Sequence, residues 1–291
     1  MLQRGFMKST SLNVVGKLPR GLVGLYQKIN AHTEALGIPY LVIGATARDI
    51  ILHHGYGAAI ERGTRDIDFG IQVQNWDQFE QLKEHLLKNG FTPDQTKVHQ
   101  LVTTVPNGER WEIDIIPFGN IAGDGNSITW PPQHDIGMSV TGFNEAFKHA
   151  LDVEIANNPN LNIKVASPAG MLLLKLISWL EREHSVRRKD AMDIFYLTRH
   201  YSKIPDIADS LYEDDFMDAQ NYDEHKASTM KLATDACSIA NEEVLSFINE
   251  KLFNIESKVD NLVLDISRAV QIEYSDAEEL LSIISEQLNT A

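Results

Sequence analysis

The sequence is poor in cysteine: Cys237 is the single one among 291 residues. An internal disulfide needs two cysteines, so a disulfide-stapled secreted fold is excluded and a reducing cytoplasm fits. Long apolar runs are also missing, since no stretch approaches the roughly 18 residues that a membrane-spanning helix needs. The first residues lack the apolar core of a secretion signal. We therefore expect a cytoplasmic protein that does not enter a membrane.

Positive charge is scarce in the last third of the chain. Residues 201–291 carry 20 acidic and 6 basic residues, whereas residues 1–200 carry 21 acidic and 20 basic ones. An acidic surface does not attract nucleic acid nonspecifically, so any RNA would dock on the amino-terminal part. Apolar spacing predicts helices over 226–252, 258–270 and 276–289, which present either a solvated acidic face or one covered by a basic partner.

Two acids stand at strand spacing in the segment Thr-Arg-Asp-Ile-Asp-Phe-Gly, residues 64–70. Polar and apolar residues alternate here, so Asp66 and Asp68 leave the same face of a predicted strand, about 6–7 Å apart at the backbone. Carboxylates at that spacing can converge on a divalent cation such as Mg²⁺. Exposed strand faces often carry two acids, so the pair alone leaves open the ordinary interpretation of a solvent-exposed strand face without a metal.

Two further segments carry polar features at strand ends. Residues 40–43 read as a buried strand, Gly44 and Ala45 follow it, and helical spacing resumes at residues 46–52. A strand that opens into a helix through glycine presents backbone N–H groups to a phosphate, although an ordinary tight turn looks the same. Downstream, Asp114 lies in an apolar strand, where a charge is expensive to bury without a partner or a metal.

A lysine interrupts an apolar helix in the second half of the chain. Ser167 followed by proline predicts the start of this helix, and Lys175 lies in its middle. The lysine either reaches an anion or extends its head to water. The next predicted helix carries Asp190 and Asp193 on one face. A surface ion pair between Lys189 and Asp193 is the ordinary interpretation of that spacing.

These motifs together resemble a known family. The order of features in the first half resembles the nucleotidyltransferase fold of the DNA polymerase β superfamily: a strand, a glycine turn, a helix, Asp-x-Asp on the next strand and a later Asp. With the lysine helix and the Lys/Arg-Asp-x-x-Asp segment, residues 35 to 205 resemble the AbiEii-type nucleotidyltransferase toxins of abortive-infection and toxin–antitoxin systems. The resemblance implies an α+β fold: a mixed sheet with flanking helices in residues 1–155, then an α-helical domain, 156–291, that contributes Lys and Asp to the cleft.

The resemblance also implies roles for individual residues. Asp66, Asp68 and Asp114 would hold two Mg²⁺ ions, with Mn²⁺ as an alternative metal. Lys175 would pair with the triphosphate, and Asp190 would orient that lysine. The nucleotide-binding set would comprise Gly44, Ala45, Thr46, Arg48, Arg65, Lys175 and Asp193. Ala45 departs from the family, which usually has glycine or serine there; alanine offers no hydroxyl and tolerates positive φ poorly.

The implied reaction moves a nucleoside monophosphate from a nucleoside triphosphate to a hydroxyl and releases pyrophosphate. Relatives of the AbiEii type imply a tRNA 3′ end as acceptor and a cognate antitoxin as partner. A housekeeping tRNA-tailing enzyme fits the lysine and aspartate motif less well. Two alternatives stay open, namely a small-molecule hydroxyl as acceptor and a catalytically idle member of the fold that serves as a binding or regulatory module.

Overall fold

The computed structural model describes residues 11–61, 63 and 66–289, which form two compact units. One unit comprises residues 11–55 and the described residues of 59–166. The other comprises residues 56–58 and 167–289. The boundary predicted at 155/156 falls within a strand, Leu151–Asn157, that belongs to the first unit.

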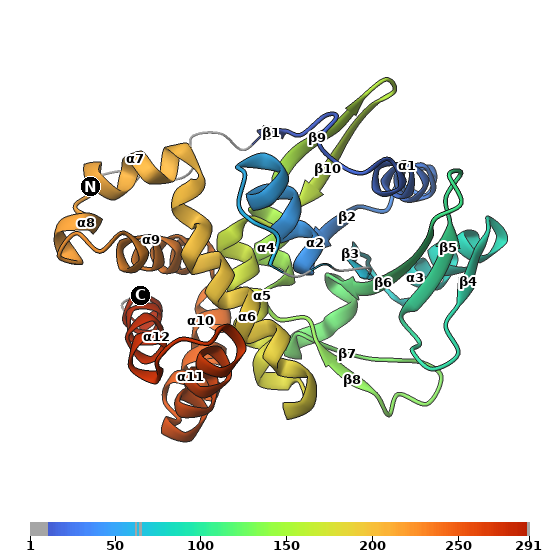
Figure 1. Ribbon diagram of the computed structural model, residues 1–291. Coiled ribbons are helices and arrows are strands. Elements are labelled where there is room, and N and C mark those ends of the chain that lie inside the picture. Colours follow the sequence, from blue (N-terminus) through green and yellow to red (C-terminus); the bar gives the residue numbers. More distant parts are fainter. Residues whose placement is uncertain (1–10, 62, 64–65, 290–291) are drawn as a thin grey trace. The chain divides into compact units, whose positions relative to one another are not determined.

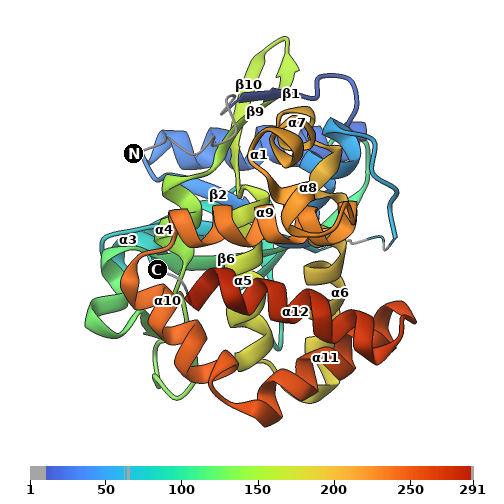
Figure 2. The same ribbon diagram turned by 90° about the vertical axis from the view of Figure 1, so that its left-hand side faces the viewer.

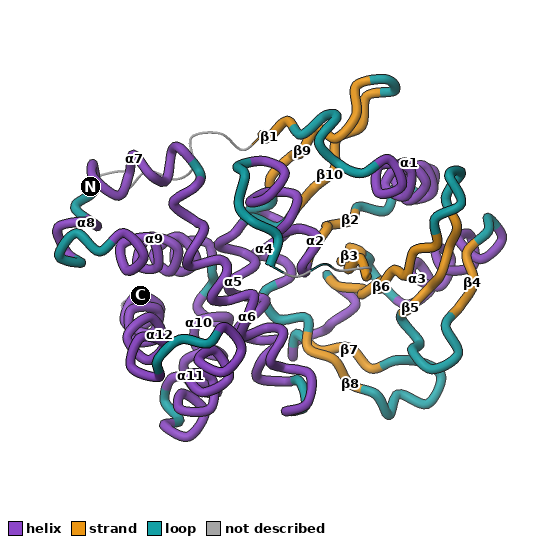
Figure 3. The backbone as a smooth tube through the Cα atoms, viewed as in Figure 1, coloured by secondary structure: helices purple, strands orange, loops and turns teal. Residues whose placement is uncertain are grey.

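The first unit is built on an eight-stranded mixed sheet (Figure 1, Figure 3). In spatial order its strands are β1 (Ser11–Asn13), β9 (Leu151–Asn157), β10 (Asn160–Val165), β2 (Tyr40–Ile43), β3 (Asp66–Gln72), β6 (Arg110–Phe118), β5 (Gln100–Thr104) and β4 (Phe91–Pro93). The pairs β1–β9, β10–β2 and β3–β6 are parallel, and the other pairs are antiparallel. A separate two-stranded ribbon joins β7 (Ser127–Thr129) to β8 (Gly137–Ser139).

The alternation of buried and less buried side chains in β3 shows which face of the sheet packs against the hydrophobic core. Ile67, Phe69 and Ile71 are buried. Two helices, α1 (Arg20–Ala35) and α3 (Trp76–Lys88), contact each other, and the α1 residue Tyr26 sets its ring edge-on against Phe69, with centroids 6.0 Å apart. Since successive side chains of a strand point to opposite faces, the acids of β3 lie on the face opposite to α1. There the short α4 (Phe143–Lys148) packs through Phe143 against Phe118 near the far end of the strands.

The predicted strand–glycine–helix connection is confirmed. β2 ends at Ile43, and α2 (Gly44–Arg48) follows directly and continues as a wider π-helical segment, Asp49–Gly55. Gly44 has a φ of 73°, in the left-handed region that L side chains rarely adopt. Glycine at this position therefore lets the chain turn from strand into helix without backbone strain.

The second unit is helical. Its core helix α5 (Pro168–Glu181) is buried nearly all round and begins where the Ser167 hydroxyl accepts a hydrogen bond from Gly170 N at 3.3 Å. The remaining helices are α6 (His184–His200), α7 (Pro205–Glu213), α8 (Phe216–Ala219), α9 (Glu224–Ile239), α10 (Glu242–Ile248), α11 (Glu256–Val270) and α12 (Tyr274–Asn289). Short 3₁₀ and π-helical segments occupy Tyr201–Lys203 and Asn249–Phe253. α12 contacts both α9 and α11 (Figure 2).

One helix prediction needs correction. The single helix expected over 226–252 is two helices, α9 and α10, because the chain breaks at Ala240 and Asn241. The Asn241 side chain accepts a hydrogen bond from Val244 N at 2.8 Å and so caps a new helix. The helices expected over 258–270 and 276–289 are present and begin slightly earlier, at Glu256 and Tyr274. None of the described helices is long and apolar enough to span a bilayer.

Candidate functional site

Four acidic residues share one face of the two central parallel strands. The register pairs Asp66 with Glu112 and Asp68 with Asp114. Neighbouring strands lie about 4.7–4.9 Å apart, so the Asp68 and Asp114 carboxylates leave adjacent backbone positions toward the same side. Like charges placed directly opposite each other destabilise a sheet, unless a cation offsets the repulsion. The sheet thus places one aspartate from each strand, Asp68 and Asp114, at adjacent positions on one face.

Gly44 makes room for the Asp68 carboxylate. A Cβ built on Gly44 would overlap with Asp68 Oδ2, so the acid rests against a position that only glycine can fill. Ala45 is the next residue and has no positive φ, since it lies within the first turn of α2. The strain expected for alanine in the phosphate turn is thus absent, because the left-handed residue is Gly44.

Asp114 has two polar neighbours at the start of β5: Gln100, the first residue of the strand, and His99 just before it. Gln100 Nε2 donates a hydrogen bond to Asp114 Oδ1 at 2.8 Å. His99 Nε2 lies 3.8 Å from Asp114 Oδ2. Neither residue was predicted as part of the site, because only the pairing of β5 with β6 brings Gln100 opposite Asp114. An isolated glutamine at the start of a short strand carries no motif that sequence analysis could use.

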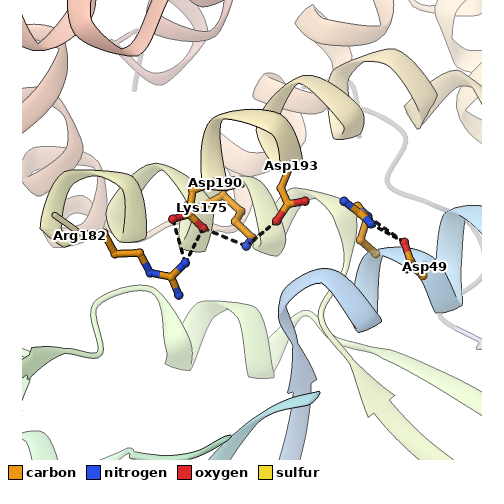
Figure 4. A network of polar contacts seen from close by, with 6 residues as sticks. Asp49, Lys175, Arg182, Asp190 and Asp193 are labelled. Carbon is orange, nitrogen blue, oxygen red and sulfur yellow. Dashed lines mark hydrogen bonds and ion pairs between the residues drawn. The ribbon is translucent and has the colours of Figure 1, made fainter. Parts of the chain in front are cut away.

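The remaining predicted nucleotide contacts of this unit have different surroundings. The Thr46 hydroxyl donates to the Asp66 carbonyl oxygen at 3.3 Å and ties α2 to the start of β3. Arg48 is buried and donates from Nε and Nη2 to Asp49 Oδ1 at 2.9 and 2.7 Å. Figure 4 shows this pair and labels Asp49. This pairing favours a structural role for Arg48, and its contact with a nucleotide stays a prediction. Arg65 lies outside the described residues.

Within the helical unit, Lys175 lies between two carboxylates. Its Nζ is 3.0 Å from Asp190 Oδ1 and 2.7 Å from Asp193 Oδ2, as Figure 4 shows. Arg182, which was not predicted, donates from Nη1 to both oxygens of Asp190, at 3.2 and 3.0 Å. The side chains of Asp190 and Asp193 are 0% and 1% exposed. The ordinary interpretation of this spacing, a surface ion pair between Asp193 and Lys189, is therefore wrong, because Asp193 is buried against Lys175.

The charge of Lys175 is secured by these neighbours. Burial lowers the pKa of the Lys175 ammonium, but the carboxylates of Asp193 and Asp190 raise it by more. The net result is a pKa above the ordinary lysine value, so the side chain is a cation throughout the physiological range. A fixed cation of this kind can bind an anion such as a phosphate oxygen.

The sheet face fits a hard divalent cation. Its donors are carboxylate oxygens, which Mg²⁺ prefers, and Mg²⁺ is usually held by one or two carboxylates together with substrate phosphates. Among the described residues no group of three or more His, Cys, Asp or Glu side chains forms a ready-made metal cage. The pair of Asp68 and Asp114 suits an ion whose coordination a triphosphate and water complete.

Comparison with known proteins finds a family model that matches most of the chain. A family model described as "Nucleotidyl transferase AbiEii toxin, Type IV TA system" matches residues 31–261. No curated protein matches the sequence. The similar solved structures include lincosamide antibiotic adenylyltransferase LnuA with lincomycin, at 16% identity, 60% of this chain, 94% of that chain and a TM-score of 0.36.

Two further structures are comparably distant. The antibiotic-resistance factor ANT(2'')-Ia shares 13% identity over 70% of this chain and 97% of that chain, with a TM-score of 0.35. The Thermotoga maritima CCA-adding enzyme in complex with tRNA shares 9% identity over 95% of this chain and 83% of that chain, with a TM-score of 0.29. Likeness at this level carries no argument about substrate.

Proposed function

The chain belongs to the AbiEii nucleotidyl transferase toxin family, and from this premise we propose that it is a Mg²⁺-dependent toxin that transfers a nucleoside monophosphate to the 3′ end of tRNA. Membership establishes the reaction class: a nucleoside triphosphate donates its monophosphate and pyrophosphate is released. The metal, the acceptor and the role in a toxin–antitoxin pair are the proposed parts.

The observation that carries the proposal is the adjacency of Asp68 and Asp114 in the parallel register. When bound between such acids, Mg²⁺ supplies charge neutralisation at the phosphates and activation of the acceptor hydroxyl. Asp66, two residues before Asp68 on the same face, is proposed as the third ligand. Gly44 leaves room for the Asp68 carboxylate, and the N–H groups at the start of α2 are proposed to receive a phosphate.

Lys175 is proposed to bind the triphosphate. An ammonium group has three N–H donors, and two of them point at Asp190 and Asp193. The third can bind a phosphate oxygen without breaking either ion pair. The two aspartates thus orient the lysine, and its fixed charge would stabilise the negative charge that develops on the leaving pyrophosphate.

The charge distribution bears on where the acceptor binds, since residues 201–291 carry 20 acids and 6 bases. An acidic surface repels the RNA backbone, so tRNA is proposed to bind through residues 1–200, where 20 basic residues stand against 21 acidic ones. The same charge distribution favours a second candidate function: transfer of the nucleoside monophosphate to the hydroxyl of a small molecule, which needs no basic surface.

A transfer assay tests the reaction and its acceptor. The protein is incubated with Mg²⁺, each α-³²P-labelled nucleoside triphosphate in turn, and total tRNA, and labelled RNA is resolved on denaturing gels. We expect a labelled tRNA 3′ end with wild type and none with Asp68→Asn or Asp114→Asn. If no acceptor is labelled and no Mg²⁺-dependent triphosphate binding occurs, a catalytically idle binding module is the better description.

A growth assay tests the biological role. Induced expression in a bacterium is expected to arrest growth, and Asp68→Asn, produced at the same level, is expected to leave growth unchanged. Co-expression of the cognate antitoxin should restore growth of cells that produce the wild type. Indifferent growth on wild-type expression would contradict the toxin role and leave the transfer assay to decide the chemistry.

A further inference from the structure

The side chain of Gln100 is buried beside the candidate metal ligands. Gln100 begins β5 opposite Asp114 of β6, is 4% exposed, and donates from Nε2 to Asp114 Oδ1 at 2.8 Å. Among the described residues its carboxamide makes no other hydrogen bond. Burying an amide is costly unless it is hydrogen-bonded, so the bond to Asp114 offsets the cost of burying this glutamine.

A carboxylate that must bind a metal needs a fixed orientation. The Asp side chain is short, but its terminal torsion is broad, so an unanchored carboxylate samples many orientations. The bond from Gln100 to Oδ1 restricts that freedom, and Oδ2, which lies 3.8 Å from His99 Nε2, is the oxygen that would bind a metal. Side chains that hold a metal ligand through a hydrogen bond typically contribute 10- to 100-fold to metal affinity.

We propose that Gln100 is a positioning residue that fixes Asp114 for coordination of Mg²⁺ through a single oxygen, an inference that rests on the proposed function. With Oδ1 engaged by the amide, two-oxygen chelation by Asp114 is disfavoured. Mg²⁺ demands near-ideal octahedral geometry, whereas the larger Ca²⁺ tolerates flexible sites and chelation by both oxygens. Gln100 therefore favours Mg²⁺ over Ca²⁺.

Calorimetric titration of metal affinity tests this inference. Mg²⁺ and Ca²⁺ are titrated separately into the full chain with a non-hydrolysable triphosphate analogue. The variants are Gln100→Leu, which loses the donor, and Gln100→His, whose Nε2–H can replace it. The control Val102→Ala lies two residues along β5, opposite Glu112, and removes packing but no donor to Asp114. Thermal melting confirms that each variant is folded, and Gln100→Met replaces the leucine variant if that one is not.

The expected outcome is a Mg²⁺ affinity about 10- to 100-fold weaker in Gln100→Leu, a smaller loss for Ca²⁺, recovery in Gln100→His and no change in Val102→Ala. Equal losses for both metals, or an unchanged Mg²⁺ affinity, would overturn the positioning role. Asp114→Asn separates the two levels of the hypothesis. If it abolishes Mg²⁺ binding while Gln100→Leu does not, the proposed function stands and only this inference fails. If wild type binds no Mg²⁺ with the analogue, both fail.

Discussion

Replacement of Lys175 by methionine is expected to destabilise the protein strongly. Methionine keeps an unbranched apolar stem of similar length but removes the ammonium that lies 3.0 Å from Asp190 and 2.7 Å from Asp193. Both carboxylates are almost completely buried, so water cannot replace the lost cation without a rearrangement of α5 and α6. Removal of one partner from a buried ion pair leaves an uncompensated charge, and that is the costly case.

The size of the expected loss in the free energy of unfolding follows from the burial of Asp190 and Asp193. Breaking a buried pair costs about 3–5 kcal/mol. Arg182 still donates to Asp190, but its side chain is 46% exposed, so its compensation is discounted for solvent screening. At about 2–4 °C per kcal/mol, the unfolding midpoint should fall by roughly 6–20 °C. The raised pKa of Lys175 means that this stabilisation is complete below the ordinary lysine pKa and is lost only as pH rises through the folded-state pKa.

Urea and thermal unfolding of Lys175→Met at about pH 8 provide the measurement, because Lys175 of the wild type is charged there. The matched control is Lys164→Met, since the Lys164–Asp152 pair at 3.1 Å is 41% and 56% exposed. That control should lose at most about 1 kcal/mol. Equal small losses in both variants would refute the argument from burial. A large loss also means that Asp68→Asn is the cleaner variant for the growth assay.

The remaining predictions concern the sheet and a second buried ion pair. Gly44→Ala should cost at least about 1 kcal/mol because of the positive φ, and its Cβ should displace the Asp68 carboxylate and abolish Mg²⁺-dependent triphosphate binding, as calorimetry can show. Asp265→Ala removes the acceptor that Trp179 Nε1 contacts at 3.0 Å and Arg187 Nε at 2.7 Å, so unfolding should require about 3–5 kcal/mol less. Mg²⁺ with a triphosphate analogue should raise the unfolding midpoint of wild type, and chelation with EDTA or Asp68→Asn should remove that gain, which differential scanning fluorimetry measures.

The parts of the fold that the sequence predicts well are those set by local pattern. The alternation around Asp68 determines which face its carboxylate leaves, and the structure has the same alternation in β3. Gly44 after a short apolar strand likewise predicts the turn into α2. The break at Asn241 could have been found too, because Asn followed by two glutamates is a helix start.

The parts that sequence analysis misses depend on which strands and helices become neighbours. Gln100 is part of the site only because β5 pairs with β6 in a register that sets it opposite Asp114. Arg182 reaches Asp190 only because the chain turns between α5 and α6. Pattern periodicity fixes the face of an element but not its partner, so contacts of this kind need the three-dimensional structure.

The sheet face distinguishes an active transferase from an idle relative on physical grounds. Asp68 and Asp114 stand side by side in the parallel register, and a neutral residue at either position would relieve their repulsion. The chain instead accommodates both acids: the missing Cβ of Gly44 leaves room for the Asp68 carboxylate, and the amide of Gln100 donates to Asp114. A cation bound at this face, as proposed above, would offset the repulsion between the two carboxylates. This arrangement favours the proposed metal-dependent transferase over an idle module.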